Sequence, residues 1–137
     1  MAKISGFREA SKALNDMSKA MARGVGRRAL KVPATILADE MRQKVPVLSG
    51  TTRESIEIGK QASFKGRPAT NVTVADIASV QLEFGNSDME AQPFARPALE
   101  AASGRMLEGF GSALKDETDK AVIRQAAREA RRQARGR

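Results

Sequence analysis

The residues that could do chemistry in this chain are carboxylates and hydroxyls in its middle third. The carboxylates are Glu54, Glu57, Glu83, Asp88 and Glu90. Paired carboxylates can hold a metal ion or act as an acid and a base, but no regular spacing joins these five. Ser49 and Ser55 have no partner base that would activate a hydroxyl. We therefore predict that the protein is not an enzyme and has no catalytic, cofactor or metal site.

Two residue types that carry much of protein chemistry are missing. The chain has no His and no Cys, which excludes imidazole bases, thiolate nucleophiles, disulfides and zinc sites built on these ligands. Met17, Met21 and Met41 are interpreted as core residues and not as a soft-metal site. The N-terminus lacks an apolar signal core and no apolar run approaches a membrane span, so we expect neither secretion nor membrane insertion.

A series of arginines near the C-terminus is the most distinctive charged feature. It consists of Arg124, Arg128, Arg131, Arg132 and Arg135. Arginine pairs with phosphate or carboxylate groups, and a row without interleaved aromatic residues suits sequence-independent attraction to a nucleic-acid backbone. Three interpretations stay open: contact with DNA, contact with an acidic protein partner, and a solvated helix end. The N-terminal set is equally ambiguous, with a solvated face favoured. It comprises Lys12, Lys19, Arg23, Arg27 and Arg28.

The net charge of +8 is unevenly distributed along the 137 residues. Residues 1–32 hold eight basic and two acidic residues, residues 33–119 hold nine and thirteen, and residues 120–137 hold seven and one. Both ends are therefore basic and the middle is mildly acidic. The length fits one domain. We predict a single domain over residues 1–119, followed by a basic helix or tail over residues 120–137.

The first part of the chain has helical periodicity. Apolar residues recur at steps of three or four at Ile4, Phe7, Ala10, Leu14, Met17 and Met21. Gly24 and Gly26 are expected to interrupt this helix. A second helical pattern then runs to Val45; Pro33 either kinks that helix or starts it, and Pro46 ends it.

The middle of the chain has the period of a β-strand. From Arg53 onward Ile56 and Ile58 alternate with polar residues, and a turn at residues 65–68 leads to a second run over residues 70–75. We predict a β-hairpin in which Val72 and Val74 face inward. Residues 77–84 fit either a strand or two helical turns.

The stretch from Glu83 to Ala98 predicts a rigid elbow. Gly85 is free to take a positive φ, and Pro93 and Pro97 restrict the backbone around Phe94, which is placed to fill a hydrophobic gap. Glu83 has three interpretations. It accepts hydrogen bonds from exposed backbone donors, pairs with Arg53 or Arg96, or lies in water at a strand edge.

A long helix is predicted after Pro97. Its apolar stripe comprises Leu99, Ala102, Met106, Phe110 and Leu114. Gly104, Gly109 and Gly111 weaken it unless close packing or bending uses them. Residues 116–119 are expected to cap a separate last helix, whose narrow apolar stripe would become ordered against a neighbour.

The predicted fold class is α+β. It has long N-terminal helices, a small antiparallel sheet built on the hairpin, and a long C-terminal helix packed on the sheet. Only 4% of residues are aromatic although 41% are hydrophobic, so the core is expected to be aliphatic and rich in alanine. Such a core buries less area per residue than an aromatic one, which favours assembly as a source of additional burial.

Two separate motifs resemble a known family. The first contains Pro46, Ser49, Gly50, Arg53, Ser55 and Ile56, and the second contains Glu83, Phe84, Gly85, Pro93, Phe94 and Pro97. In order and spacing they resemble the tailed-bacteriophage family typified by gene product 10 of phage HK97, over residues 25 to 115. Thr52 departs from the family pattern, where Leu is common, and this puts one buried contact near the first strand in question.

The resemblance implies a virion protein at the head–tail junction, described as a head–tail joining, neck or tail-completion protein. It implies assembly as a ring, with six copies as the expected number, next to head-closure and tail-terminator or tail-tube proteins. The basic termini would lie near the phage DNA, and the protein would be made in the bacterial host cytoplasm. The hairpin edge and the elbow are the candidate ring surfaces. The alternative function is a small basic nucleic-acid-binding protein.

Overall fold

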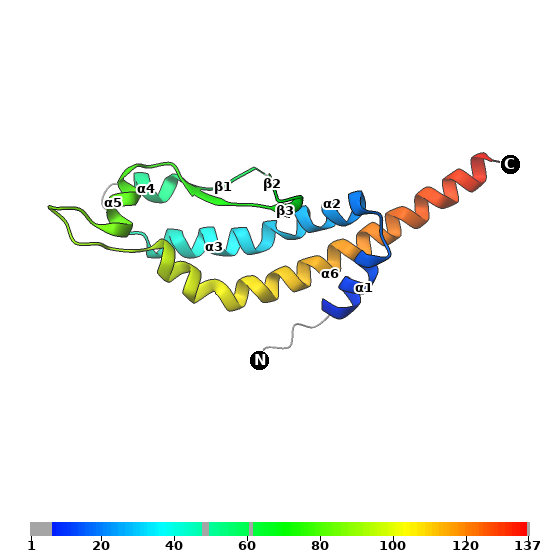
Figure 1. Ribbon diagram of the computed structural model, residues 1–137, viewed down its shortest axis with the longest axis horizontal. Coiled ribbons are helices and arrows are strands. Elements are labelled where there is room, and N and C mark those ends of the chain that lie inside the picture. The colour runs from blue at the N-terminus through cyan, green and yellow to red at the C-terminus, as the bar shows by residue number, and fades with distance from the viewer. Residues whose placement is uncertain (1–6, 48–49, 61, 137) are drawn as a thin grey trace.

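Two long helices run side by side along the length of the protein (Figure 1). They are α3 (Lys31–Lys44) and α6 (Ala95–Arg135), which run in opposite directions. The structure is a computed structural model, and it describes residues 7–47, 50–60 and 62–136. Ile4 and Ser49 lie outside these ranges. The predicted α+β class is confirmed, with a long C-terminal helix and two small antiparallel ladders.

The N-terminal part forms α1 (Phe7–Asn15) and α2 (Lys19–Ala29), and α2 leads through Leu30 into α3. The predicted interruption at Gly24 and Gly26 is wrong. The break lies at residues 16–18, because Ser18 Oγ accepts a hydrogen bond from Met21 N at 3.3 Å and caps α2. Gly26 instead permits close packing, since a Cβ there would lie 3.1 Å from Pro68 Cγ.

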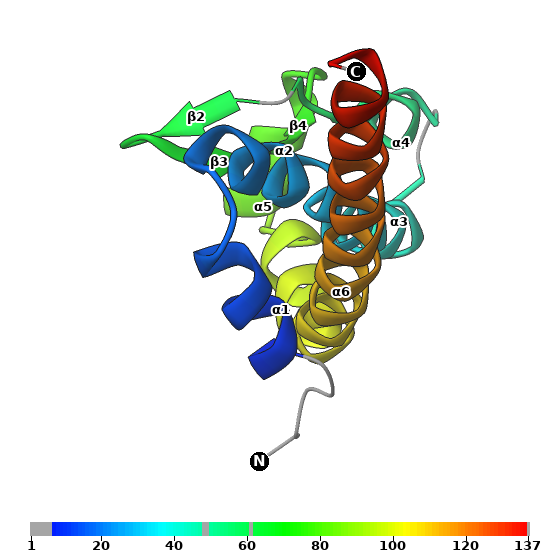
Figure 2. The ribbon, with the colours of Figure 1, turned by 90° about the vertical axis from the view of Figure 1, so that its right-hand side faces the viewer.

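The proline predictions hold for α3. Pro33 lies in the first turn of α3, which begins at Lys31 directly after the αR residue Leu30, and the last helical residue is Lys44, two positions before Pro46. Viewed along α6, α2 lies between the β2–β3 ladder and α1 (Figure 2).

The predicted hairpin is present, as two consecutive ladders. β1 (Ile56–Ile58) pairs with β4 (Val72–Val74), and β2 (Ala62–Phe64) pairs with β3 (Arg67–Ala69). Lys65 and Gly66 form the tip with positive φ values. Two boundaries differ from the prediction. The residues from Arg53 to Glu54 belong to a helical turn, α4 (Thr51–Glu54), and Arg67 and Pro68 belong to β3.

Residues 77–84 were open to two interpretations, and the helical one is confirmed. They form α5 (Ala78–Phe84) and the residue before it. Ser79 and Leu82 are buried on one side of this helix. The apolar residues at helical spacing, Ile77, Val80 and Phe84, lie on the outside and are 84%, 58% and 75% exposed.

The C-terminal part is one unbroken helix, so the prediction of a separate last helix capped at residues 116–119 is wrong. Thr118 is buried within it and donates a hydrogen bond to Leu114 O at 2.6 Å. We predicted from the sequence that this helix packs on the sheet. It packs mainly on α3 instead, and β1 and β4 contact the other side of α3.

Alanine and glycine let α3 and α6 approach closely. A Cβ on Gly109 would lie 3.0 Å from side-chain atoms of Val32 and Ile36, and Gly111 is buried. The buried core is aliphatic and rich in alanine, as predicted, with Ala34, Ala38, Ala98 and Ala102 along this interface. Two clusters form it, one at the elbow end and one around α1, α2 and the middle of α6.

Candidate functional site

The elbow (residues 83–98) is a tight reversal, as the sequence predicted. Gly85 has a φ of 73°, and a Cβ there would lie 2.7 Å from Ala91 N. Asn86 Oδ1 accepts a hydrogen bond from Asp88 N at 2.9 Å. Gln92 N donates to Leu82 O at 2.7 Å, which ties the returning chain to α5. The backbone of the elbow is therefore held at several points.

Glu83 closes the elbow by capping α6. Its Oε2 accepts hydrogen bonds from Phe94 N at 2.8 Å and Ala95 N at 2.9 Å, and its Oε1 accepts one from Arg96 N at 3.0 Å. These N–H groups belong to the first turn of α6, which has no side-chain cap at Phe94 itself. The first interpretation of Glu83 is confirmed, and no ion pair with Arg53 or Arg96 occurs in the part of the chain that is described.

The environment of Glu83 shifts its acidity. Partial burial raises the pKa of this carboxyl, but the hydrogen bonds from Ala95, Phe94 and Arg96 outweigh burial and leave the pKa below its usual value of 4.5. Glu83 is therefore ionised at neutral pH, and its negative charge lies at the positive end of the α6 dipole. This arrangement stabilises the elbow, and the ionised carboxylate has no proton to donate at neutral pH.

Phe94 brings the two sequence motifs together. It is 1% exposed and lies in one core cluster with Ile56 of the first motif and with Leu82 and Ala98 beside the second. The predicted role of Phe94 as a hydrophobic filler is therefore confirmed. Two segments 38 residues apart, at Ile56 and Phe94, share this core.

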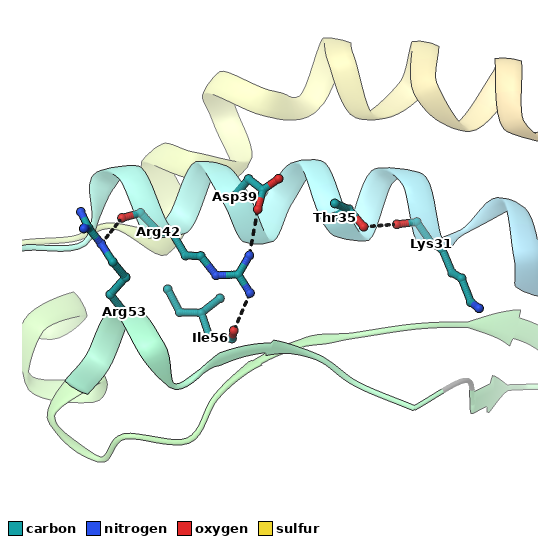
Figure 3. A network of polar contacts seen from close by, with 6 residues as sticks. All are labelled: Lys31, Thr35, Asp39, Arg42, Arg53 and Ile56. Atoms are coloured by element: carbon teal, nitrogen blue, oxygen red, sulfur yellow. Dashed lines mark hydrogen bonds and ion pairs between the residues drawn. The ribbon is translucent and has the colours of Figure 1, made fainter. Parts of the chain in front are cut away.

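The first motif is fastened to α3 by arginine side chains (Figure 3). Arg53 Nε donates a hydrogen bond to Arg42 O at 3.0 Å, and the Arg42 guanidinium donates to Ile56 O at 2.7 Å and to Asp39 at 2.8 Å. Arg53 thus positions α4 against the end of α3. Gly50 precedes α4 with a φ of 81°, as predicted for a positive-φ residue.

Hydroxyl groups of the first motif also have structural partners. Thr52 is buried, and its hydroxyl donates a hydrogen bond to Asp76 Oδ2 at 2.5 Å. This bond and the one from Ala78 N lower the pKa of Asp76. Ser55 Oγ donates to Thr52 O at 2.8 Å and accepts from Asp76 N at 3.2 Å. A polar contact at Thr52 therefore replaces the apolar one that a Leu would make, and the Ser55 hydroxyl is bonded to two backbone groups.

The outer face of the elbow end is apolar. A shallow groove of about 510 Å³ lies between α5 and the start of α6, and Val74, Val80, Phe84 and Pro93 form much of its wall. We call Ile77, Val80 and Phe84 together the α5 face. The sequence left residues 77–84 open between a strand and two helical turns, and it did not predict that Val80 and Phe84 are surface residues.

The C-terminal part of α6 projects away from the rest of the protein (Figure 1). We call residues 122–136 the tail. All of these residues are exposed, and Ala121 is the last buried one. The predicted arginines therefore lie on a free helix, where Arg124 and Arg128 line a shallow cleft with Arg28 of α2. The structure does not bring the tail and the elbow together, because they lie at opposite ends of α6.

The polar groups of the two motifs make contacts within the fold, and the α5 face and the tail are exposed surfaces. No group of three or more His, Cys, Asp or Glu residues could hold a metal ion among the residues described. Within the same ranges, no helix is long and apolar enough to cross a membrane. Comparison of the chain with protein-family models, with characterised proteins and with solved structures finds no match.

Proposed function

We propose that the protein is a structural component of a tailed-bacteriophage virion, which forms a ring at the head–tail junction and completes or joins the tail. The observation that carries this proposal is the construction of the elbow. The carboxylate of Glu83 is used internally, on three backbone donors, while the exposed apolar α5 face lies beside the elbow. A part built in this way suits binding to another protein surface and not the conversion of a small molecule.

The elongated shape supports assembly into a ring. A closed ring needs two different surfaces on each copy, one of which meets the other on the next copy. The elbow and the tail are separate surfaces at opposite ends of the protein, and the hairpin adds an exposed Phe64. The resemblance of the two motifs supplies the expected neighbours, namely head-closure and tail-terminator or tail-tube proteins, and the expected six copies.

Deletion of the gene from the phage tests this proposal. We expect filled heads and separate tails to accumulate, and a plasmid copy of the gene should restore joined particles in negative-stain micrographs. Mass spectrometry of purified wild-type particles should detect the protein. Normal joining after deletion, together with absence of the protein from particles, would contradict the proposal.

A second candidate function has its own supporting observation. The arginines of the tail are all exposed on one projecting helix, which suits binding to a nucleic-acid backbone by a small basic protein. Such binding would weaken steeply with salt, with a logarithmic slope of about 0.9 for each neutralised phosphate of duplex DNA. Titration of labelled DNA of two unrelated sequences, at several salt concentrations, measures that slope and any sequence preference.

A further inference from the structure

The elbow end and the tail have opposite charges. Residues 68–98 contain four acidic residues and one basic residue, Arg96, whereas the tail contains five basic residues and one acidic residue. The acidic ones are Asp76, Glu83, Asp88 and Glu90. Asp88 and Glu90 are exposed on the loop next to the α5 face. The two surfaces are therefore electrostatically complementary.

The tail also has an apolar side. Successive residues of a helix are about 100° apart, which separates the tail residues into an apolar sector and an arginine sector. The apolar sector contains Val122, Ile123, Ala126, Ala127, Ala130 and Ala134. Ile123 is 68% exposed, and the other members are exposed as well. The sector is thus the apolar face of an amphipathic helix, and it is exposed in the part of the chain that the structure describes.

The shapes of the two apolar surfaces suit each other. The α5 face presents the bulky side chains of Ile77, Val80 and Phe84, whereas the tail presents mostly alanines. Small residues let a helix approach closely, and bulky residues on the opposite surface then fill the space between the backbones. The same protein already uses this arrangement at Gly109, which receives Val32 and Ile36 of α3.

Contact between the two surfaces must involve two copies. The 41 residues of α6 span about 60 Å at 1.5 Å per residue, with the elbow at one end and the tail at the other. Since this helix is unbroken, the tail of one copy cannot turn back to its own elbow (Figure 1).

We infer that the α5 face and the acidic elbow loop of one copy receive the tail of the next copy. This inference rests on the self-assembly that the proposed function requires, and it names the two surfaces that meet. A contact of this kind is heterologous, so it builds a ring when the rotation between copies closes. Docking would also bury the apolar sector, which is exposed in a single copy.

Cysteine cross-linking tests the contact directly, because the natural chain has no Cys. One protein carries Val80→Cys and a second, differing in mass by a tag, carries Ile123→Cys. Both positions are exposed, so the folded structure should be retained, and circular dichroism verifies this. After mixing and mild oxidation, we expect the mixed disulfide to exceed a control pair by about fivefold or more, since docking raises the local concentration of the two thiols.

The control pair is Phe64→Cys with the same Ile123→Cys protein. Phe64 is similarly exposed but lies on the hairpin, so this pair measures random collision and also reports a tail–hairpin contact. Glu90→Arg should reduce the Val80–Ile123 product, and so should roughly 1 M NaCl, where charges are screened within about 3 Å. Glu108→Arg on the exposed surface of α6 should leave the yield unchanged.

The possible outcomes separate this inference from the proposed function. If light scattering shows oligomers but the Val80–Ile123 yield does not exceed the control, the inference is overturned while ring assembly stands on another surface. A higher Phe64–Ile123 yield would place the tail on the hairpin and also overturn it. A strictly monomeric protein whose tail substitutions alter only DNA binding would overturn it in favour of a nucleic-acid contact. The gene deletion decides the virion role independently of all three results.

Discussion

The two ends of α6 differ in how their residues are used. At its N-terminal end, Glu83 accepts three backbone hydrogen bonds and Phe94 is fully enclosed. At its C-terminal end, no residue after Ala121 is buried among those described. One end of the helix is therefore fixed by the rest of the chain, and the other is exposed. Residues at the first end hold the fold, and we propose that residues at the second make contacts between molecules.

The largest difference in stability is expected between the alanine variants of two phenylalanines of the elbow. Phe94→Ala should lower the free energy of unfolding by about 3–5 kcal/mol, because it leaves a cavity in the cluster with Ile56 and Leu82. Phe84→Ala should change it by less than about 0.5 kcal/mol, since Phe84 is on the surface. Urea denaturation followed by circular dichroism measures both, and similar losses for the two variants would contradict the assigned burial.

Substitution by alanine should change the free energy of unfolding in opposite directions at two glycines. Gly85→Ala should cost about 1–3 kcal/mol, because Gly85 has a φ of 73° and its Cβ would meet Ala91 N. Gly104→Ala should stabilise the protein by up to about 1 kcal/mol, since Gly104 lies within α6 and a Cβ there meets nothing within 4 Å. Thermal unfolding of both variants gives the signs, and a stabilising Gly85→Ala would refute the tight reversal.

Glu83→Gln should cost about 1–2 kcal/mol, because a charged acceptor on three backbone donors is replaced by a neutral one. Glu90→Gln, on the exposed loop, is the matched control and should change stability by less than about 0.5 kcal/mol. Equal stability of the wild type and Glu83→Gln in urea denaturation at neutral pH would show that Glu83 does not cap α6.

The stabilisation that Glu83 provides should decrease as the pH falls. The pKa of Glu83 is below 4.5 in the folded protein, so its contribution is fully present above the unfolded pKa and is lost as the pH falls through the folded pKa. The stability difference between the wild type and Glu83→Gln should therefore be constant at neutral pH and shrink in acid below about pH 4.5. If the stability difference between the wild type and Glu83→Gln grows as the pH falls, capping of α6 by the ionised Glu83 is contradicted.

The smallest expected effect on stability is in the tail. Ile123→Ser should leave the free energy of unfolding of the monomer within about 0.5 kcal/mol of the wild type, because the Ile123 side chain is 68% exposed. The same variant should self-associate more weakly in sedimentation velocity. Leu107→Ser, at another exposed position of α6, controls for the loss of any surface aliphatic residue and should not weaken association.

Local signals predicted much of the fold. The elbow was predicted from Gly85, Pro93 and Pro97. The hairpin was predicted from the alternation of apolar and polar residues around Ile56. Both signals depend only on residues a few positions apart. The prediction that Gly24 and Gly26 interrupt the helix was wrong. Gly26 lies within α2, where its lack of a side chain allows close packing against Pro68. The prediction of a separate last helix was wrong. Residues 116–119 continue α6, which packs against α1 and α2.

The candidate site was predictable only in part, for a physical reason. Backbone capping by Glu83 was one of three interpretations that its position before a turn and a helix start allowed, and the structure selects it. Exposure of the α5 face did not follow, because an apolar residue contributes the same pattern to a core or to an interface. The hairpin and α6 occupy opposite sides of α3, and only the three-dimensional arrangement shows which face of α5 is left uncovered.

The mass of the protein in solution tests the central claim most directly. That claim is that the elbow end is a surface for another copy of the protein. Light scattering of the wild type over a wide concentration range should give a multiple of 14.7 kDa, while Phe84→Ser, with an unchanged melting temperature, should return to 14.7 kDa. A wild type that stays at 14.7 kDa throughout, or a Phe84→Ser variant with the same higher mass, would contradict the account.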